Sequence, residues 1–306
     1  MSHSTCVWES ELLTIKRTEK MKKNYFFAIG ITLMLVLLSG NQVIAGGGWP
    51  QKKGTGYFKL GQYFLRSSQY FNPEGNLINV QPRISVYNTS FYGEYGITDR
   101  LTGIVYFPFF SRSTLNNLER RNGDIVPGDE VNSIGDTDIS LKYGLIVNKP
   151  IVVSAKLTFG LPLGKASGGS TNTLQTGDGE FNQMLTIEAS HSFYPIPLYA
   201  SVAAGFNNRT NNFSDEVRFG AEAGYTIGKF TAVARVNMVE SLMNGDGTTN
   251  SNQGVFGNNI EYFSFSPELI YSITEKAGVS MSVATAFSGR QVLASPAFDI
   301  GAFIKF

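Results

Sequence analysis

Apolar and polar residues alternate with a period of two along most of the chain after residue 45. In residues 216–227, one face carries Val217, Phe219, Ala221, Ala223, Tyr225 and Ile227, and the other carries Glu216, Arg218, Gly220, Glu222, Gly224 and Thr226. Similar runs cover 137–145, 153–161, 229–239 and 279–287. Runs of about ten alternating residues are typical of tilted membrane-spanning strands. After residue 45 no stretch reaches the roughly 18 consecutive apolar residues that a membrane-spanning helix requires.

A water-soluble β-sandwich would also alternate, because one face of each sheet is core and the other is wet. Two features favour a membrane barrel instead. The polar face consists of Gly, Ser, Ala and scattered charges, which are small enough to fit inside a barrel lumen. The apolar face ends in aromatic residues, as expected of girdles at the membrane interfaces. These aromatics are Tyr143, Phe159, Phe193, Tyr225, Phe230 and Tyr271.

The connections between the strands alternate in length. Short turns are predicted at 98–100, 148–150, 194–197, 228–229 and 274–277, and longer polar loops at 67–81, 112–134, 163–179, 208–215, 241–257 and 288–294. This alternation predicts an all-β fold: an antiparallel up-and-down transmembrane barrel of about 12 strands, with both termini at the periplasmic end. The predicted strands are 56–66, 82–97, 101–111, 135–147, 151–162, 180–193, 198–207, 216–227, 230–240, 259–272, 278–287 and 296–306. The first three carry aromatic residues on both faces.

The first 45 residues have the pattern of a secretory signal peptide. Basic residues at Met21-Lys22-Lys23 precede an apolar stretch over 25–38, and Val43-Ile44-Ala45 provides a cleavage site after Ala45. The apolar stretch is shorter than the ~20 residues of a membrane anchor, which is the alternative. Residues 1–45 are therefore predicted to be an N-terminal extension with a cleaved signal peptide, starting at Met1 or Met21, and 46–306 the outer-membrane barrel.

Composition narrows the function classes. The formal charge of +1 provides no basic face for nucleic acid. The single cysteine, Cys6, falls in the part predicted to be removed, so no disulfide framework is expected. No cofactor and no metal site are predicted. The expected partners are outer-membrane lipid and lipopolysaccharide, the barrel-assembly machinery and a small hydrophobic solute.

The last strand alternates up to the final residue, with Phe298, Ile300, Ala302, Ile304 and Phe306 on one face. A terminal Phe after such a series resembles the sorting signal that the barrel-assembly machinery reads. Phe306 is the predicted sorting residue.

Several segments resemble the phenol-degradation meta-pathway outer-membrane family, whose members are often called transporters. The similar segments are Ile134-Gly135-Asp136-Thr137-Asp138-Ile139-Ser140-Leu141-Lys142-Tyr143, Gly96-Ile97-Thr98-Asp99-Arg100-Leu101, Lys156 to Pro162, Thr176-Gly177-Asp178-Gly179 and Pro197-Leu198-Tyr199. The resemblance implies an outer-membrane barrel and uptake of aromatic or other hydrophobic compounds. The long-chain fatty-acid channels carry a plug-like N-terminal segment. Here about ten residues, 46–55, precede the first strand, so no large plug is expected.

Inward-facing charges are the candidate lumen residues. If Gly228-Lys229 is a two-residue turn, Glu222 lies opposite Arg235. Lys142 and Lys156 face inward around another short turn and need nearby acids, for which Asp138 and Glu188 are candidates. Aromatic lumen contacts are expected from Tyr92, Tyr199, Tyr262 and Phe303. The alternative interpretation is that all these charges are structural ion pairs that fill the barrel.

The remaining candidates favour no enzyme. His191 is predicted to face outward near the membrane interface, and the His-x-Ser spacing of an outer-membrane phospholipase is absent because Phe193 takes the Ser position. The acidic loop residues Asp124, Asp129, Glu130, Asp136 and Asp138 match no calcium-loop spacing. The predicted function is passive passage or capture of a small hydrophobic or aromatic molecule. The alternatives are a structural or surface-interaction barrel with a plugged lumen and, less favoured, a lipid-modifying enzyme.

Overall fold

The computed structural model describes residues 47–249 and 256–306, and their regular elements are all strands. The predicted signal peptide and its cleavage site at Ala45 lie outside these residues. The barrel strands are β1 (Gly56–Phe71), β2 (Leu77–Gly96), β3 (Leu101–Leu115), β7 (Thr137–Ile146), β8 (Ile151–Leu161), β9 (Asn182–Ser192), β10 (Leu198–Arg209), β11 (Glu216–Ile227), β12 (Phe230–Ser241), β13 (Glu261–Ser272), β14 (Ala277–Arg290) and β16 (Ala297–Lys305).

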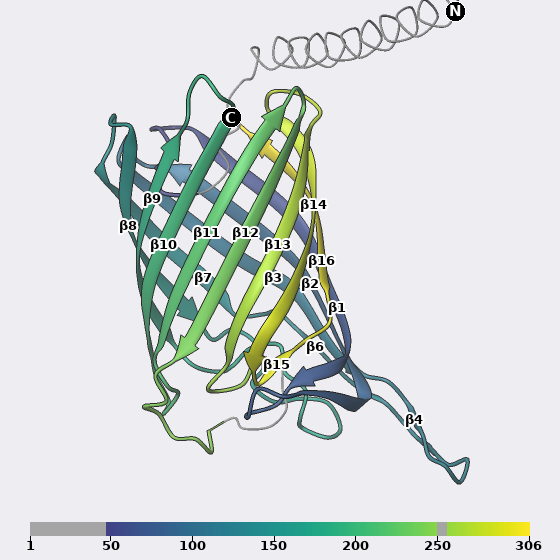
Figure 1. The fold of residues 1–306 in the computed structure, drawn as a ribbon. Coiled ribbons are helices and arrows are strands. Elements are labelled where there is room, and N and C mark those ends of the chain that lie inside the picture. The colour runs from purple at the N-terminus through teal and green to yellow at the C-terminus, as the bar shows by residue number, and fades with distance from the viewer. Residues whose placement is uncertain (1–46, 250–255) are drawn as a thin grey trace, which may run out of the picture.

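These twelve strands form a closed antiparallel barrel (Figure 1). Each strand pairs with its neighbour in sequence, and β16 returns to pair with β1, for example at Tyr57↔Lys305 and Leu65↔Ala297. Full closure leaves no free strand edge, which is what a sheet in lipid requires. The predicted fold class is confirmed.

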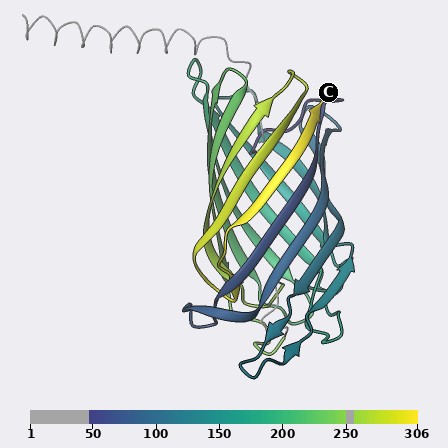
Figure 2. The ribbon, with the colours of Figure 1, turned by 90° about the vertical axis from the view of Figure 1, so that its right-hand side faces the viewer.

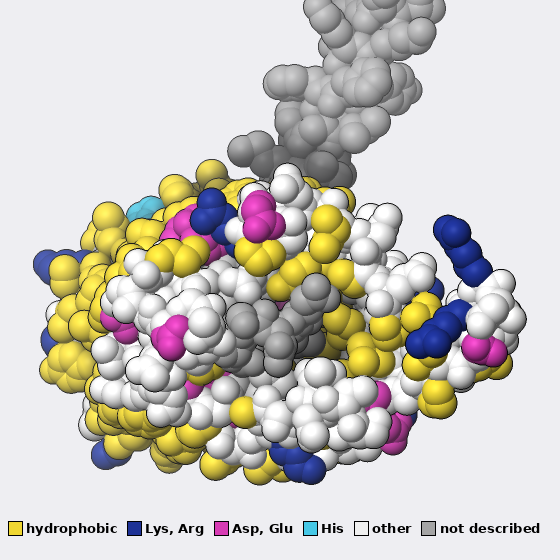
Figure 3. Space-filling view, turned by 90° about the horizontal axis from the view of Figure 1, so that it is seen from below, with side chains coloured by type: hydrophobic (Ala, Val, Ile, Leu, Met, Phe, Trp, Pro, Cys, Tyr) yellow, Lys and Arg dark blue, Asp and Glu magenta, His cyan; other side chains and the backbone are white. Residues whose placement is uncertain are grey.

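The inward and outward faces follow the alternation of the sequence. In β7, Ile139, Leu141 and Tyr143 are 47–48% exposed on the outside, whereas Ser140 and Lys142 between them are buried. The apolar outer surface shows on the flanks of the barrel, while polar side chains gather on the loops (Figure 3). Among the described residues no helix is long and apolar enough to cross a membrane.

The predicted loop over 67–81 is wrong. β1 continues to Phe71 and β2 begins at Leu77, so the connection is a short turn, and the two strands project beyond the barrel wall (Figure 2). A register shift between Ser67 and Gln69 interrupts the alternation, and the pairing resumes at Gln69↔Asn79. The bulge changes which residues face inward. The alternation on which the strand prediction depends therefore breaks off at residue 67, which is why the predicted strand ends at residue 66.

The extension of β1 and β2 builds an apolar core at the long-loop end of the barrel. The short strand β15 (Val292–Leu293) pairs with the end of β1, and β6 (Asp129–Ser133) pairs with the end of β3. The buried core residues are Leu65, Tyr70, Val80, Ile84, Val86, Leu293 and Ala297. The hairpin of β4 (Leu118–Glu119) and β5 (Ile125–Val126) projects away from the barrel (Figure 1). The lumen at this end is therefore narrowed by apolar packing.

Candidate functional site in the barrel lumen

The predicted opposition of Glu222 and Arg235 is confirmed by the register of β11 and β12. The Gly228-Lys229 turn is two residues long, and Gly228 adopts a φ of 58°, which glycine tolerates without strain. Arg235 Nε donates to Glu222 Oε2 at 2.6 Å. Arg235 Nη1 also lies 2.7 Å from Glu268 Oε2 on β13. One guanidinium therefore bridges carboxylates on both neighbouring strands.

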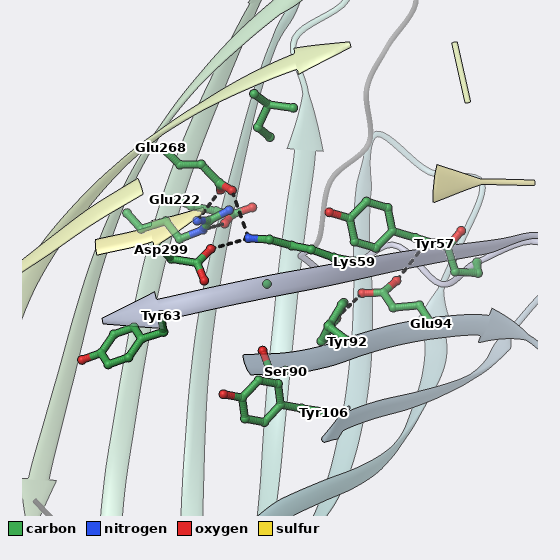
Figure 4. Close-up of a pocket in the computed structure, with 14 residues that line it drawn as sticks. Tyr57, Lys59, Tyr63, Ser90, Tyr92, Glu94, Tyr106, Glu222, Glu268 and Asp299 are labelled. Carbon is green, nitrogen blue, oxygen red and sulfur yellow. Dashed lines mark hydrogen bonds and ion pairs between the residues drawn. The ribbon is translucent and has the colours of Figure 1, made fainter. Parts of the chain in front are cut away.

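The first and last strands of the barrel, β1 and β16, add two more charged residues to this group of ion pairs. Lys59 on β1 lies 2.6 Å from Asp299 on β16 and 3.8 Å from Glu268. Figure 4 shows Lys59 pointing from its strand toward the two carboxylates. The group of Glu222, Arg235, Glu268, Lys59 and Asp299, called the mid-lumen network below, has three formal negative charges and two positive ones. Its balance favours cations near this part of the lumen.

The mid-lumen network faces a cavity of about 430 Å³. The other lining residues are mostly tyrosines and small residues: Tyr57, Tyr63, Tyr92, Tyr106, Gly61 and Ser90 (Figure 4). Tyr92 Oη donates a hydrogen bond to Glu94, which also lines the cavity. The cavity thus combines aromatic faces on one wall with paired charges on the other.

A second cluster joins Lys142, Lys156 and Glu188 near the short-turn end. Lys142 and Lys156 are direct partners across β7 and β8. Glu188 on β9 lies 3.0 Å from Lys142 Nζ and 2.6 Å from Lys156 Nζ. Of the two acids predicted for the lysines, Glu188 therefore makes the ion pairs. The Lys142 and Glu188 side chains are 4% and 7% exposed, so these charges are far less hydrated than ordinary surface pairs.

The segment 47–51, which precedes β1, lies inside the lumen against this cluster. Gly47 O accepts from Lys142 Nζ at 2.6 Å, and Gly48 N donates to Ser190 Oγ at 2.7 Å. A Cβ on Gly48 would lie 2.9 Å from Glu188 O, so only glycine fits this close approach. Further along, Gln51 Nε2 donates to Glu94 Oε2 at 2.8 Å.

The position of segment 47–51 inside the lumen was not predicted from the sequence. The segment is short, as expected, but it is threaded through the lumen and fixed by hydrogen bonds to β7, β9 and β2. Its side-chain contact is aromatic: the Trp49 ring meets Tyr199 edge-on at 5.8 Å. Segment 47–51 therefore narrows the short-turn end of the barrel.

The predicted aromatic candidates all lie on inward faces. Tyr199 is 8% exposed, and a Cβ on Gly224 would meet its ring at 2.1 Å. Tyr262 shares the inward face of β13 with Glu268, six residues further along. Phe303 packs with Val233 and Ile270 and stacks on Tyr57 with ring centroids 5.4 Å apart. Phe303 thus belongs to an apolar cluster rather than to an open surface. Whether any of these rings contacts a ligand stays a prediction.

At the long-loop end, Arg209 ties a loop to the barrel. Its guanidinium pairs with Glu180 at 2.8 Å, Glu216 at 2.7 Å and Asp178 at 3.2 Å. Glu180 is fully buried, and its second oxygen accepts from Thr210 N at 2.9 Å. The loop between β8 and β9 is therefore docked over the wall of β10 and β11.

The same loop brings Asp178 close to Asp136, which directly precedes β7. Asp136 accepts from the backbone N–H groups of Gly164 and Asp178 at 2.9 and 2.7 Å. Burial and the nearby charge of Asp178 raise the pKa of Asp136 to about 7. Protonation of Asp136 near neutral pH therefore relieves a repulsion inside the docked loop.

His191 lies at the short-turn end of the barrel, directly after the inward-facing Ser190 of β9. Its Nδ1 is 2.7 Å from Pro150 O, and its ring meets Phe193 edge-on at 4.5 Å. Both contacts suit a residue at the membrane interface. Among the described residues, no group of three His, Cys, Asp or Glu side chains is placed to hold a metal ion.

Phe306 closes the barrel seam next to the start of β1. Gly56 N donates to Phe306 O at 3.0 Å, and the Phe306 ring packs on Phe58 at 5.3 Å. Its role as a sorting residue stays a prediction.

Sequence reasoning missed Glu268, Lys59, Asp299 and Arg209. Glu268 could have been found by counting along β13, had the register of β12 with β13 been known. Lys59 and Asp299 meet because the first and last strands pair, and no local pattern of residues signals that contact.

No family profile matches the chain, and no curated protein matches it. Several solved structures are similar to the chain. An outer membrane channel from Pseudomonas putida F1 is 14% identical over 86% of this chain and 100% of that chain, with a TM-score of 0.57. The translocator domain of the autotransporter NalP from Neisseria meningitidis is 9% identical over 94% of this chain and 98% of its own, with a TM-score of 0.49.

The toluene transporter TbuX from Ralstonia pickettii is 11% identical over 84% of this chain and 90% of its own, with a TM-score of 0.42. Of these three, the P. putida channel is the one whose score exceeds 0.5. At 14% sequence identity, the similarity to this channel is a similarity of fold. The chain has the fold of an outer-membrane β-barrel.

Proposed function

We propose that the protein is an outer-membrane channel for passage or capture of a small hydrophobic or aromatic molecule. The observation that carries the proposal is the 430 Å³ lumen cavity, in which tyrosines face a network of paired charges. Tyrosine rings supply apolar contact area, and the charged wall excludes molecules that are merely oily. The P. putida barrel of the same fold is a channel, which is in keeping with this proposal.

The two ends of the lumen support selective rather than general passage. Segment 47–51 narrows the short-turn end, and the apolar core around Leu65 and Val86 narrows the long-loop end. A general porin would instead need an open, water-filled lumen. We therefore expect low conductance to simple ions and a preference for solutes that carry an aromatic ring.

Planar-bilayer measurements test the proposal with two cations that cannot cross lipid unaided, benzyltrimethylammonium and propyltrimethylammonium. We expect the aromatic cation to be several-fold more permeant in the wild type. Tyr106→Ala should remove this preference and Tyr106→Phe should retain it, because Tyr106 lines the cavity with its ring. Tyr143→Ala is the matched control, since Tyr143 is 47% exposed on the outer wall.

A structural or surface-interaction barrel is the second candidate, and the threaded segment 47–51 together with the docked β8–β9 loop favours it. Reconstituted protein that conducts neither cation would support this alternative and contradict the channel. In either case we propose outer-membrane lipid and lipopolysaccharide as the surroundings and Phe306 as the residue that the assembly machinery reads. Deletion of Phe306 should then lower the amount of assembled barrel in the outer membrane.

A further inference from the structure

The charged groups around the lumen cavity do not balance. Those that line it are Glu94, Glu222, Glu268, Asp299, Lys59 and Arg235. Four formal negative charges therefore face two positive ones. Both cations already belong to the mid-lumen network, which keeps one negative charge in excess. Glu94 lies outside that network and supplies the second uncompensated charge.

Glu94 is buried without a counter-charge. The residue is 4% exposed, and among the described residues no ion pair joins it to a Lys or an Arg. Its two oxygens accept hydrogen bonds from neutral donors, Gln51 Nε2 at 2.8 Å and Tyr92 Oη. Figure 4 shows Lys59 extending away from Glu94, toward the carboxylates of the mid-lumen network. A buried carboxylate without a cation is costly, so a positively charged solute would stabilise it.

Tyrosine rings surround this carboxylate. Tyr57 is the direct partner of Glu94 across β1 and β2. Tyr92 lies two residues away on the same face of β2 and is the direct partner of Tyr106 on β3. Together with Tyr63 these residues form one side of the cavity, called the tyrosine wall below. The face of an aromatic ring carries negative charge density, so the tyrosine wall attracts cations as Glu94 does.

The protein's own cations contact other rings. Among the described residues, the cation–ring contacts are those of Arg209 with Phe213 and of Lys305 with Phe303, outside the tyrosine wall. An alkylated ammonium ion is suited to such a wall, because recognition of quaternary ammonium groups by aromatic rings is a recurrent use of this interaction. A small inorganic cation would instead require several oxygen ligands around it.

We propose that the lumen cavity binds organic ammonium ions. The cationic head lies against the tyrosine wall beside Glu94, and an apolar body fills the rest of the cavity. The volume of about 430 Å³ is within the range of roughly 300–1,000 Å³ found for small-molecule sites. A neutral solute would leave Glu94 without a counter-charge, and an anion would be repelled by both uncompensated charges. This inference rests on the proposed function of the same cavity and names the class of its solute.

Equilibrium binding tests the inference with two probes of the same shape. Choline carries a quaternary nitrogen where 3,3-dimethylbutan-1-ol carries a carbon, so the two differ in charge. Each is titrated calorimetrically into the folded protein in a nonionic detergent. We expect choline to bind about tenfold more tightly than the alcohol. Equal affinities, or a failure of choline to bind, would overturn the ammonium site.

A charge-removing substitution tests the role of Glu94. Glu94→Gln keeps the size of the side chain and should weaken choline binding about tenfold, while binding of the neutral alcohol stays unchanged. Glu130→Gln is the matched control, since Glu130 is 54% exposed and pairs with Arg112 far from the cavity lining. Choline binding that is the same in both variants would overturn the proposal.

Two substitutions of Tyr92 separate its ring from its hydroxyl group. Tyr92→Phe removes the oxygen that donates to Glu94 and keeps the ring, whereas Tyr92→Leu removes both. Choline affinity should be largely retained in Tyr92→Phe and should fall about fivefold in Tyr92→Leu. The heat-dependent gel shift checks that each variant is a folded barrel. Equal choline affinity in the two variants would contradict recognition by the ring.

The bilayer experiment with benzyltrimethylammonium and propyltrimethylammonium separates a failure of this inference from a failure of the channel, because binding requires no passage. A barrel that binds choline but conducts neither cation would support the ammonium site and contradict the channel. A barrel that retains the aromatic preference but binds choline and the alcohol equally would support the channel and overturn the ammonium site.

Discussion

The two charge clusters of the lumen differ in hydration and in sign. The cluster of Glu188 with Lys142 and Lys156 has one more positive than negative charge, and it is buried beneath segment 47–51. The mid-lumen network has one more negative charge and faces the tyrosine-lined cavity. Buried ion pairs are costly to break, whereas hydrated ones tune the local field. We infer that the first cluster holds the constriction in place and the second selects what passes it.

The largest expected effect comes from removing the shared acid of the buried cluster. Glu188→Gln leaves Lys142 and Lys156 without a counter-charge and should cost about 3–5 kcal/mol of unfolding free energy. Urea titration of the folded, gel-shifted band measures it. Glu130→Gln is the control, because Glu130 is 54% exposed and pairs with an exposed Arg112, so about 1 kcal/mol or less is expected. Equal losses of unfolding free energy in the two variants would contradict the view that the Glu188 cluster is less hydrated than an exposed ion pair.

The mid-lumen network should show measurable coupling with a smaller loss of stability. A double-mutant cycle with Glu222→Gln and Arg235→Gln should give a coupling free energy of about 1 kcal/mol, as for opposite charges directly across a ladder. Arg235→Gln should also raise cation selectivity in planar bilayers, because it leaves Glu222 and Glu268 without their shared guanidinium. Zero coupling would mean that the pair is screened by water.

A substitution in segment 47–51 tests whether this segment limits flow through the lumen. Gly48→Leu cannot keep its close approach to the Glu188 backbone, so the segment should leave the lumen and single-channel conductance should rise several-fold. Gly247→Leu is the control, since the space around Gly247 is open within 4 Å. Unchanged conductance in the Gly48 variant would show that the segment does not limit flow.

The smallest expected effect concerns pH and the docked β8–β9 loop. The pKa of Asp136 is raised to about 7 in the folded loop, above the ordinary value of 3.8. The contribution of Asp136 to docking is therefore fully present below pH 3.8 and is lost as the pH rises through about 7. Hydrogen exchange of 163–179 should be faster in the wild type than in Asp136→Asn at pH 8, and the difference should shrink steadily as the pH falls toward 3.8. A ratio that does not change with pH would exclude this titration.

How far the sequence could be interpreted depended on the distance between the interacting residues along the chain. Glu222 and Arg235 were placed correctly because a two-residue turn sets the register of its own hairpin. The extension of β1 to Phe71 was missed because the bulge at Ser67 breaks the alternation on which the prediction relied. Glu188 was named as one of two possible acids, and the pairing of β8 with β9 was needed to select it.

Outside the bulged ends of β1 and β2, the sequence by itself determined which residues face lipid and which face the lumen, and it determined the number of barrel strands. These properties follow from alternation and turn chemistry, which act over a few residues. The tertiary structure alone decided that Lys59 meets Asp299 and Glu268 and that segment 47–51 lies inside the lumen. Such contacts depend on closure of the barrel, which joins residues far apart in the chain and leaves no local pattern.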